Sequence, residues 1–481
     1  MKRKFFTNLL LLISLNLLIK PFWIFGIDRT IQNTVGSEEY GLYFSLFNFS
    51  LLLNILLDLG ITNYNNRNIS QHNQIVRKSL SHIIGLRLLL VLAYSLITII
   101  AGLIIGYDIR QFKLLTFLIC NQFLVSSILY LRSNLSGLHH FKTDSIISVL
   151  DRLLMIFICG LLLWGNTIKA TFKIEWFIYA QTVSYIITLL ITIIIVNSKA
   201  KFEKLKFSRS YFVVVLKKSI PYAVLALLTL FHFRIDSVML ERMLPMGKLQ
   251  AGIYAQSFRV LDAAVMFSFL FASLLLPIFS KMIKEKQSIH NLTLFSFLLL
   301  VIPSIGIAII AHFYQIEFMS LLYKEHAIIS GKIFSVLMVS FVSISATYIF
   351  GTLLTANGNL YELNIIAGLG VFTNLTLNLI LIPRYQALGA AYASLITQSL
   401  IAATQIIVSK RKFGFNFNIK RIILLVIFSA GTYYISYLSI QINWYWIYKV
   451  IIIGVVMLIW AFILKLINIK LIISLLLNED E

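Results

Sequence analysis

The chain has 481 residues, of which 59% are hydrophobic and only 12% are charged. A soluble domain carries about a quarter charged residues, so this composition excludes a water-soluble globular protein and indicates a membrane protein. Lys and Arg number 41 against 19 Asp and Glu, for a net charge of +22. In a membrane protein this excess is explained by cytoplasmic loops that face anionic lipid, rather than by nucleic acid.

The N-terminal sequence Met1-Lys2-Arg3-Lys4 precedes an apolar run that continues to about Ile27 without a small-residue cleavage pattern. We interpret this run as a retained first span rather than as a signal peptide. A membrane-spanning helix needs about 20 mostly apolar residues. Windows of that length predict fourteen spans, at 8–27, 41–63, 82–106, 114–138, 145–165, 175–197, 219–244, 251–278, 292–314, 330–356, 362–383, 388–409, 422–440 and 447–467. Twelve core spans with an optional last pair is the alternative.

The basic residues of the loops give the orientation. With the N-terminus inside, cytoplasmic segments carry 24 Lys and Arg and the opposite loops carry 9. This bias predicts that both termini lie in the cytoplasm and that the number of spans is even.

The longest polar interruption follows the sixth span and predicts a division of the chain into lobes. We expect an N-terminal six-helix lobe at 1–197, a basic cytoplasmic linker at 198–218 and a C-terminal six-helix lobe at 219–409, followed by a basic loop, two helices and a tail at 410–481. Gly41-Leu42-Tyr43 and Gly252-Ile253-Tyr254 open the second and eighth spans and are a weak internal repeat. Parallel repeats of this kind hold substrate between lobes near the middle of the membrane.

Short loops and the absence of cofactor motifs argue against a membrane enzyme. No loop between the predicted spans exceeds about 22 residues, and no phosphate-binding loop motif occurs. Cys120 and Cys159 lie in apolar windows without partner spacing, and His139-His140 lack neighbouring ligands. We therefore expect no disulfide, metal or cofactor.

Eight basic residues lie inside predicted spans or close to their ends, where a cation costs about 2.5–3.5 kcal/mol at mid-membrane and usually faces a polar interior. They are Lys20, Arg87, Arg132, Arg152, Arg234, Arg242, Arg259 and Lys332. Arg152 and Arg242 each follow an acidic residue, which favours a structural role near the interface. For Arg87 and Arg132 two interpretations stand equal: a functional role, or a side chain that extends to the membrane surface. For Lys332 the second interpretation is favoured.

Lys20, Arg234 and Arg259 are the strongest functional candidates. Asp262 lies at i+3 from Arg259, so these two charges can neutralise each other on one helix face. Arg234 and Asp236 do not share a face, so we expect their partners on other helices or on a ligand.

Two spans carry single polar stripes at steps of four residues, Ser50, Asn54 and Asp58 in one and Gln122, Ser126 and Tyr130 in the other. Such stripes either join helices through hydrogen bonds or line a cavity. Together with the intramembrane cations, they predict a polar, cationic interior that suits an anionic cargo, because Arg binds phosphate oxygens in a bidentate way. A cavity dominated by the acids Asp58, Asp236 and Asp262 would instead suit an ion-coupled exporter.

Several segments resemble the polysaccharide-biosynthesis branch of the multidrug/oligosaccharidyl-lipid/polysaccharide exporter superfamily. They are Arg234-Ile235-Asp236-Ser237-Val238-Met239-Leu240, Gly252-Ile253-Tyr254-Ala255, Arg259-Val260-Leu261-Asp262, Leu354-Thr355-Ala356-Asn357-Gly358-Asn359, Asn374-Leu375-Thr376-Leu377-Asn378, Leu381-Ile382-Pro383 and Gly389-Ala390-Ala391. The resemblance implies an all-α, MATE-like bundle of about 14 helices, V-shaped, with two six-helix lobes and a C-terminal helix pair.

The resemblance also implies a function. It points to a Wzx-type flippase in the bacterial cytoplasmic membrane, which moves undecaprenyl-pyrophosphate-linked sugar units outward for O-antigen or capsule assembly beside a polymerase and a chain-length regulator. The expected substrate-binding residues are Lys20, Arg29, Arg87, Arg132, Arg234 and Arg259, with Asp58, Asp236 and Asp262 available for ion coupling. A multidrug exporter coupled to an ion, and a membrane enzyme such as a polymerase or glycosyltransferase, are the competing hypotheses.

Overall fold

The computed structural model describes residues 14–62, 65, 76–138, 140–165, 172–200, 207–415 and 419–466. The start of the first predicted span, the centre of the predicted basic linker and the C-terminal tail lie outside these residues. The chain divides into two compact units, Met1–Ala255 and Gln256–Glu481, which are described separately. The predicted lobe boundaries at 197, 218 and 409 stay a prediction.

The described residues are helical and contain no strand, so the all-α fold class is confirmed. Eleven helices in this part of the chain are long and apolar enough to cross a membrane, which makes this a multi-pass membrane protein. Helix α14 covers two predicted spans. The described part of the first predicted span is helical, and the second predicted span is interrupted after Leu52.

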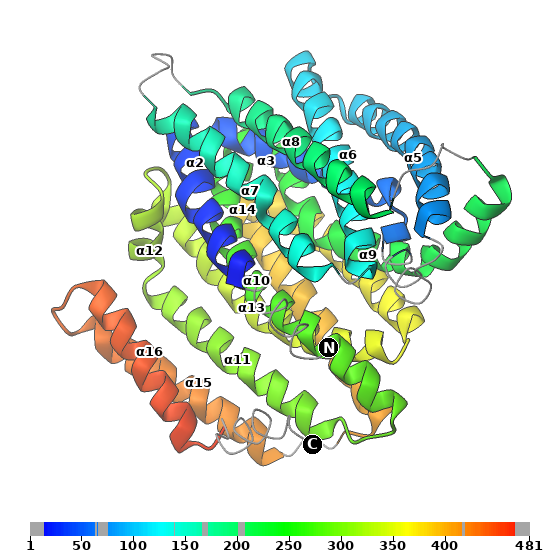
Figure 1. The fold of residues 1–481 in the computed structure, drawn as a ribbon. Helices are drawn as coiled ribbons and strands as arrows, with labels where there is room; N and C mark the ends of the chain where they lie inside the picture. The colour runs from blue at the N-terminus through cyan, green and yellow to red at the C-terminus, as the bar shows by residue number, and fades with distance from the viewer. Residues whose placement is uncertain are drawn as a thin grey trace. The chain divides into compact units, whose positions relative to one another are not determined.

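The first unit holds residues 14–22, which are helical, and the elements that follow them in the chain. These are η1 (Trp23–Asp28), α2 (Arg29–Val35), α3 (Ser37–Leu52), η2 (Asn54–Leu57), α5 (Val76–Ile105), α6 (Ile109–Gly137), α7 (Phe141–Trp164), α8 (Ile174–Ala200), α9 (Arg209–Met243) and the start of α10 (Gly247–Lys284). Helix α3 packs on α6 and α9, and α6 packs on α8 (Figure 1).

The second predicted span is broken in the membrane. Its α-helix ends at Leu52, the short 3₁₀ segment η2 follows, and Leu59 and Gly60 have positive φ angles of 44° and 77°. At Gly60 a Cβ would lie 2.7 Å from the carbonyl oxygen of Ser219, so the break needs glycine both for its backbone angle and for this close approach. The break places Asp58 in irregular backbone, where its carboxylate accepts from the amide of Thr62 at 3.2 Å.

The second unit holds the remainder of α10 and six further helices. They are α11 (His290–Phe313), α12 (Gln315–Leu322), α13 (Ala327–Ala356), α14 (Leu360–Phe413), α15 (Ile419–Ile440) and α16 (Trp446–Ile463). Short α12 was not predicted from the sequence. Helix α14 has 54 residues, far more than one crossing of a bilayer needs, and it is interrupted at Gln386 with φ 55° and ψ −133°. The interruption separates the predicted spans 362–383 and 388–409.

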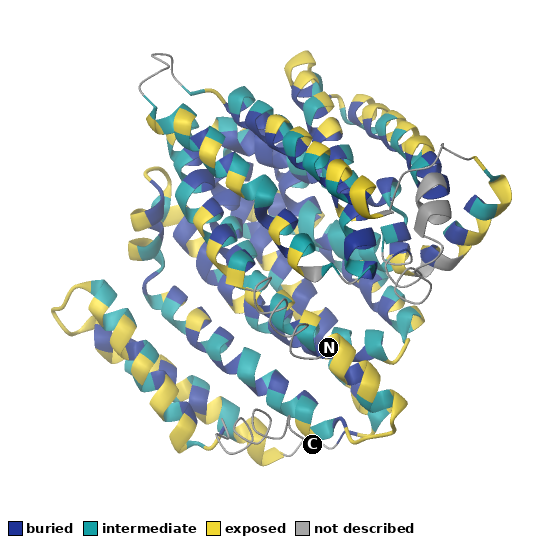
Figure 2. Cartoon of the chain, in the orientation of Figure 1, coloured by how far each residue is buried: buried dark blue, intermediate teal, exposed yellow. Residues whose placement is uncertain are grey.

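Burial identifies the central helix of each unit (Figure 2). In α13 and α6, 67% and 61% of the apolar window is buried, against 17% in α5 and in α16. The apolar side chains left exposed on α5 and α16 suit contact with lipid tails. Helix α15 packs on α11 and on α16, so the C-terminal pair is attached to its unit through α11 (Figure 1).

Candidate functional site

The two predicted polar stripes face each other in the first unit. Asn54 donates to the side-chain oxygen of Gln122 at 2.6 Å, and the Gln122 amide donates to the Ser50 hydroxyl at 3.3 Å. The hydroxyl of Tyr94, on α5, donates to the backbone oxygen of Ser50 at 2.9 Å. These bonds join the second predicted span to α5 and α6, which is the helix-joining role that the sequence left open.

Arg87 extends this ladder of hydrogen bonds from α5. Its guanidinium lies 2.7 Å from Asp58, donates to the Ser126 hydroxyl and sits 4.9 Å from the centre of the Tyr130 ring. The Arg87 side chain is 7% exposed and that of Asp58 is 20% exposed. The two residues therefore form a largely buried ion pair, one a predicted substrate ligand and the other a predicted coupling acid. On its other side Arg87 lines an apolar pocket of about 330 Å³ between α5, α6 and α8.

A second charge cluster gathers around the first helix. Lys20 lies close enough to Arg152, Asp151 and Arg132 for their charges to act on it. The Arg152 guanidinium stacks 5.4 Å above the Trp23 ring and lies 3.6 Å from Asp151. The stacking of Arg152 on Trp23 joins α7 to the first helix.

Asp144 completes this cluster as the partner of Arg132. The Arg132 Nε lies 2.7 Å from the Asp144 carboxylate, and the side chains of Arg132 and Arg152 remain 19% and 31% exposed. The cluster, defined as Lys20, Arg132, Asp144, Asp151 and Arg152, holds three cations against two carboxylates. The cluster therefore has more basic side chains than carboxylates, and its arginines keep partial accessibility within predicted membrane spans.

Two buried aspartates each accept a hydrogen bond from a tyrosine. Tyr40 donates to Asp28 at 2.7 Å, and Tyr254 donates to Asp236 at 2.8 Å. The aspartates are 2% and 1% exposed, and both follow an isoleucine. The sequence predicted a partner for Asp236 on another helix or on a ligand, and Tyr254 of α10 is a partner of the first kind.

The other predicted ligands are placed as follows. Arg29 begins α2 directly after Asp28, and Arg234 lies on α9 near Asp236; both are partly buried. In the second unit, Arg259 lies 3.6 Å from Asp262 at i+3, as the spacing on the helix predicted. Their side chains are 14% and 24% exposed.

Arg242 belongs to an interlocked set of side chains where α6 begins and α9 ends. It lies 2.7 Å from Glu241, donates to Gln111 at 2.9 Å and stacks 4.2 Å above the Tyr107 ring. Burial, and then the Glu241 charge, raise the pKa of the Tyr107 hydroxyl, so it stays neutral beneath the guanidinium. This contact set supports the structural role that the sequence predicted for Arg242.

Sequence reasoning missed two members of the Lys20 cluster. Arg152 was expected near the interface because it follows Asp151, and Asp144 was not singled out. Helical spacing could have pointed to Arg152. Lys20 and Trp23 are three residues apart and share one helix face, and the Arg152 guanidinium stacks on the Trp23 ring. Nothing in the local pattern shows that α7 packs on that face.

Comparison with known proteins identifies relatives of this architecture. A sequence model of the family described as polysaccharide biosynthesis protein matches residues 8–283. No curated protein matches the chain. A solved structure of the lipid II flippase MurJ in an inward closed conformation has a TM-score of 0.74 and 16% identity, over 92% of this chain and 97% of its own.

Two further solved structures share the fold. An inward-facing multidrug resistance MATE family transporter of the MOP superfamily has a TM-score of 0.65 and 13% identity, over 81% of this chain and 94% of its own. A MOP superfamily transporter from Pyrococcus furiosus, described by the reverse polarity of its binding pocket, has a TM-score of 0.58 and 13% identity, over 85% and 94%.

The helices and the charges held within them define a multi-pass membrane protein with the fold of the MOP superfamily transporters. The family match covers more than half of the sequence, so the chain belongs to the polysaccharide biosynthesis protein family.

Proposed function

We propose that this protein is a flippase that moves an undecaprenyl-pyrophosphate-linked oligosaccharide across the bacterial cytoplasmic membrane, for O-antigen or capsule biosynthesis, by alternating access. The family supports a role in polysaccharide assembly, and one of its structural relatives is a lipid II flippase. The observation that carries the proposal is that basic side chains outnumber carboxylates in the Lys20 cluster.

The chemistry of the cluster suits a pyrophosphate. Arg132 and Arg152 are partly exposed and offer guanidinium donors, and Lys20 adds a compact charge beside them. Asp144 lies 2.7 Å from Arg132, and Asp151 lies 3.6 Å from Arg152, so both guanidinium groups already have a carboxylate partner. A phosphate that binds there replaces a carboxylate as the partner of a guanidinium group. Such an exchange gives transient binding, and transport requires that the cargo also leaves.

The remaining predicted substrate ligands fall into two groups, according to the role that the proposal gives them. We assign Arg29 and Arg234, both partly buried, to further steps of headgroup passage. Arg87 and Arg259 lie against Asp58 and Asp262, so their first role in the proposal is to hold helices and to neutralise those acids. The charge bias of the loops assigns both termini to the cytoplasm.

The test is transport by the Lys20→Gln/Arg152→Gln variant in a bacterial strain that lacks its own flippase, with membrane level measured in parallel. We expect surface polysaccharide to fall at least about tenfold while lipid-linked oligosaccharide accumulates on the inner leaflet, because two intramembrane cations are lost. The matched control is Lys332→Gln/Arg384→Gln, which removes two exposed cations elsewhere. Equal surface polysaccharide in the two variants, at equal protein level, would refute the role of the cluster.

Ion-coupled drug export is the second candidate, and the buried Asp28 and Asp236 are the observation that favours it. In that case proteoliposomes would show cation-dependent drug efflux that Asp236→Asn abolishes. Lipid-linked sugars would have no effect on this efflux.

A further inference from the structure

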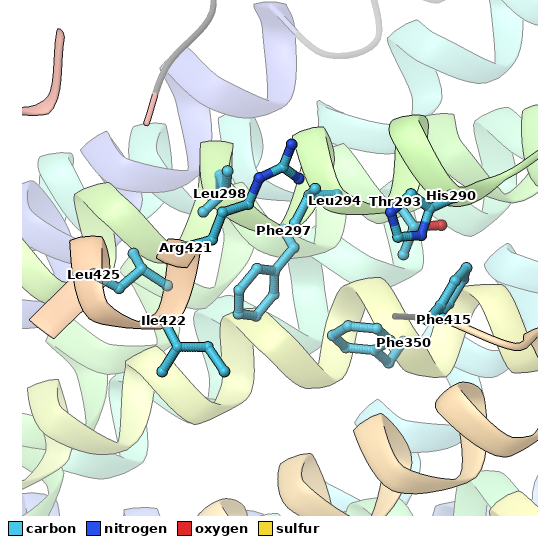
Figure 3. A pocket seen from close by; sticks show the side chains of 10 residues that line it. All are labelled: His290, Thr293, Leu294, Phe297, Leu298, Phe350, Phe415, Arg421, Ile422 and Leu425. Atoms are coloured by element: carbon cyan, nitrogen blue, oxygen red, sulfur yellow. The ribbon is translucent and has the colours of Figure 1, made fainter. Parts of the chain in front are cut away.

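An apolar pocket of about 430 Å³ opens in the second unit where α11, α13 and α15 meet. Figure 3 shows the Phe297 ring of α11 between Phe350 of α13 and the α15 side chains Ile422 and Leu425. Arg421 of α15 and His290 of α11 also line the pocket, and Phe415 lies at one end of it. The pocket is therefore apolar along its length and basic at its rim.

A second, polar pocket of about 380 Å³ adjoins the first. Both pockets are lined by His290 and Phe415, whose rings lie 5.5 Å apart. The second pocket adds Lys286 and Lys412, together with the amides of Gln287 and Asn357. The two pockets together form one amphipathic site, with an apolar part and a cationic part.

Positive charge dominates the segments around the polar pocket. The chain between 281 and 290, 357 and 362, and 410 and 415 contains six Lys and Arg but only two acids, Glu285 and Glu362. Glu362 already lies 2.7 Å from Lys412. Lys286 and Arg421 are exposed, so their charges are available to a ligand. The loop charge bias places this end of the unit at the cytoplasmic leaflet, where anionic lipids attract basic segments.

We propose that this amphipathic site binds an anionic glycerophospholipid, with an acyl chain in the apolar pocket and the phosphate headgroup at Lys286 and Lys412 of the polar pocket. Arg421 adds a further cation on the wall of the apolar pocket. Basic pockets between membrane helices at the cytoplasmic side fit such headgroups. The site uses residues apart from the Lys20 cluster, so it stands independently of the proposed transport function.

The bound lipid has a structural consequence for the C-terminal helices. Helices α15 and α16 are attached to the second unit through α11, and the apolar pocket lies in the seam between α15 and that helix. An acyl chain there contacts α11, α13 and α15 at once and fills space that no side chain fills. The lipid therefore fixes the C-terminal pair, and membrane composition regulates how firmly it is held.

The test compares the full-length protein in nanodiscs of phosphatidylglycerol or phosphatidylcholine, by thermal unfolding and by native mass spectrometry of retained lipid. The wild type is expected to unfold at a higher temperature in phosphatidylglycerol and to retain that lipid. The Lys286→Gln/Arg421→Gln variant, which leaves the Lys412–Glu362 pair intact, should bind it about tenfold more weakly or worse. Lys332→Gln/Arg384→Gln, at the opposite predicted end of the unit, should behave as the wild type. If Lys286→Gln/Arg421→Gln and the control Lys332→Gln/Arg384→Gln preferred phosphatidylglycerol equally, the proposal would be overturned.

A second variant tests the apolar part without touching any charge. Ile422 is 47% exposed, so Ile422→Trp can fill the pocket from its rim without disturbing the core. We expect this variant to lose retained phosphatidylglycerol while the loop cations remain. Retention at the wild-type level would exclude the apolar pocket as the chain site, and displacement of the lipid by micromolar undecaprenyl phosphate would reassign the site to an isoprenoid lipid.

Discussion

Arg87 shows how strongly a membrane constrains a single charged side chain. It has an ion-pair partner, a hydroxyl acceptor and an aromatic ring around it, and only 7% of its side chain is exposed. In hydrocarbon a cation without such partners is costly. The first requirement on Arg87 is therefore stability, whatever its part in transport.

This gives a prediction for the Arg87–Asp58 pair. Arg87→Gln leaves the Asp58 carboxylate partly buried without its guanidinium and should destabilise the protein by about 3–5 kcal/mol. Adding Asp58→Asn should restore much of the loss, because the buried charge is then removed as well. Thermal unfolding in detergent measures both variants. Losses that simply add in the double variant would mean that the pair does not act as a unit.

At the same scale, sequence reasoning found the charged residues but not their partners. The Arg259–Asp262 contact follows from spacing within one helix, and it was predicted. The partner of Arg87 lies 29 residues away on another element, and nothing in the local pattern selects Asp58 over other acids.

At the scale of helices, α3 and the start of α10 approach each other closely in the first unit. A Cβ at Gly41 would collide with the backbone of Lys248 and Gly252, and a Cβ at Gly252 would collide with the carbonyl group of Ser37. These glycines open the two halves of the weak internal repeat. Their absence of side chains is what allows the two backbones to touch.

Gly41→Ala and Gly252→Ala should therefore each force the two helices apart and sharply lower the yield of monodisperse protein. The control is Gly160→Ala on α7, where a new Cβ would find its nearest neighbour at 3.6 Å, an ordinary contact. Size-exclusion chromatography of the three variants checks this expectation. Normal yield from Gly252→Ala would contradict the close crossing.

The interruption of α14 gives a second prediction for an element. Gln386 adopts a backbone conformation that is nearly restricted to glycine. Gln386→Gly should relieve about 1–3 kcal/mol of strain and raise the unfolding temperature. The control for loss of the side chain is Gln386→Ala, which removes the same amide and keeps the strain. A Gly variant no more stable than the Ala variant would count against a strained bend.

At the scale of the whole molecule, the distribution of Lys and Arg predicts the orientation of the chain in the membrane. Ser288 is exposed before α11, and Gln441 is exposed between α15 and α16. The charge bias predicts that the first lies on the cytoplasmic side and the second outside.

Single cysteines test this orientation after Cys120 and Cys159 are replaced by serine. In intact cells, Gln441→Cys should react with a membrane-impermeant thiol reagent and Ser288→Cys should react only after permeabilisation. The reverse pattern would invert the topology. It would also move the basic pocket of the second unit to the outer leaflet.

The composition of the sequence predicts that this protein lies in a lipid bilayer and that its secondary structure is helical. Backbone groups in lipid must all be hydrogen-bonded, which helices and closed barrels achieve. Because 59% of residues are hydrophobic and the apolar runs are continuous over about 20 residues, the sequence fits helices rather than the alternating strands of a barrel. The positions of the predicted spans follow directly from that requirement. The two polar stripes were also visible, since a period of four residues marks one face of a helix.

The packing of the helices against one another selects which of those faces meet. It paired the stripe ending at Asp58 with that of Gln122, and it stacked Arg152 on Trp23, which lies more than a hundred residues away in the chain. It also broke the second span at Gly60 and α14 at Gln386. A helix records its own hydrophobic face in its sequence, whereas the partner of that face depends on packing among all the helices, which no local pattern contains.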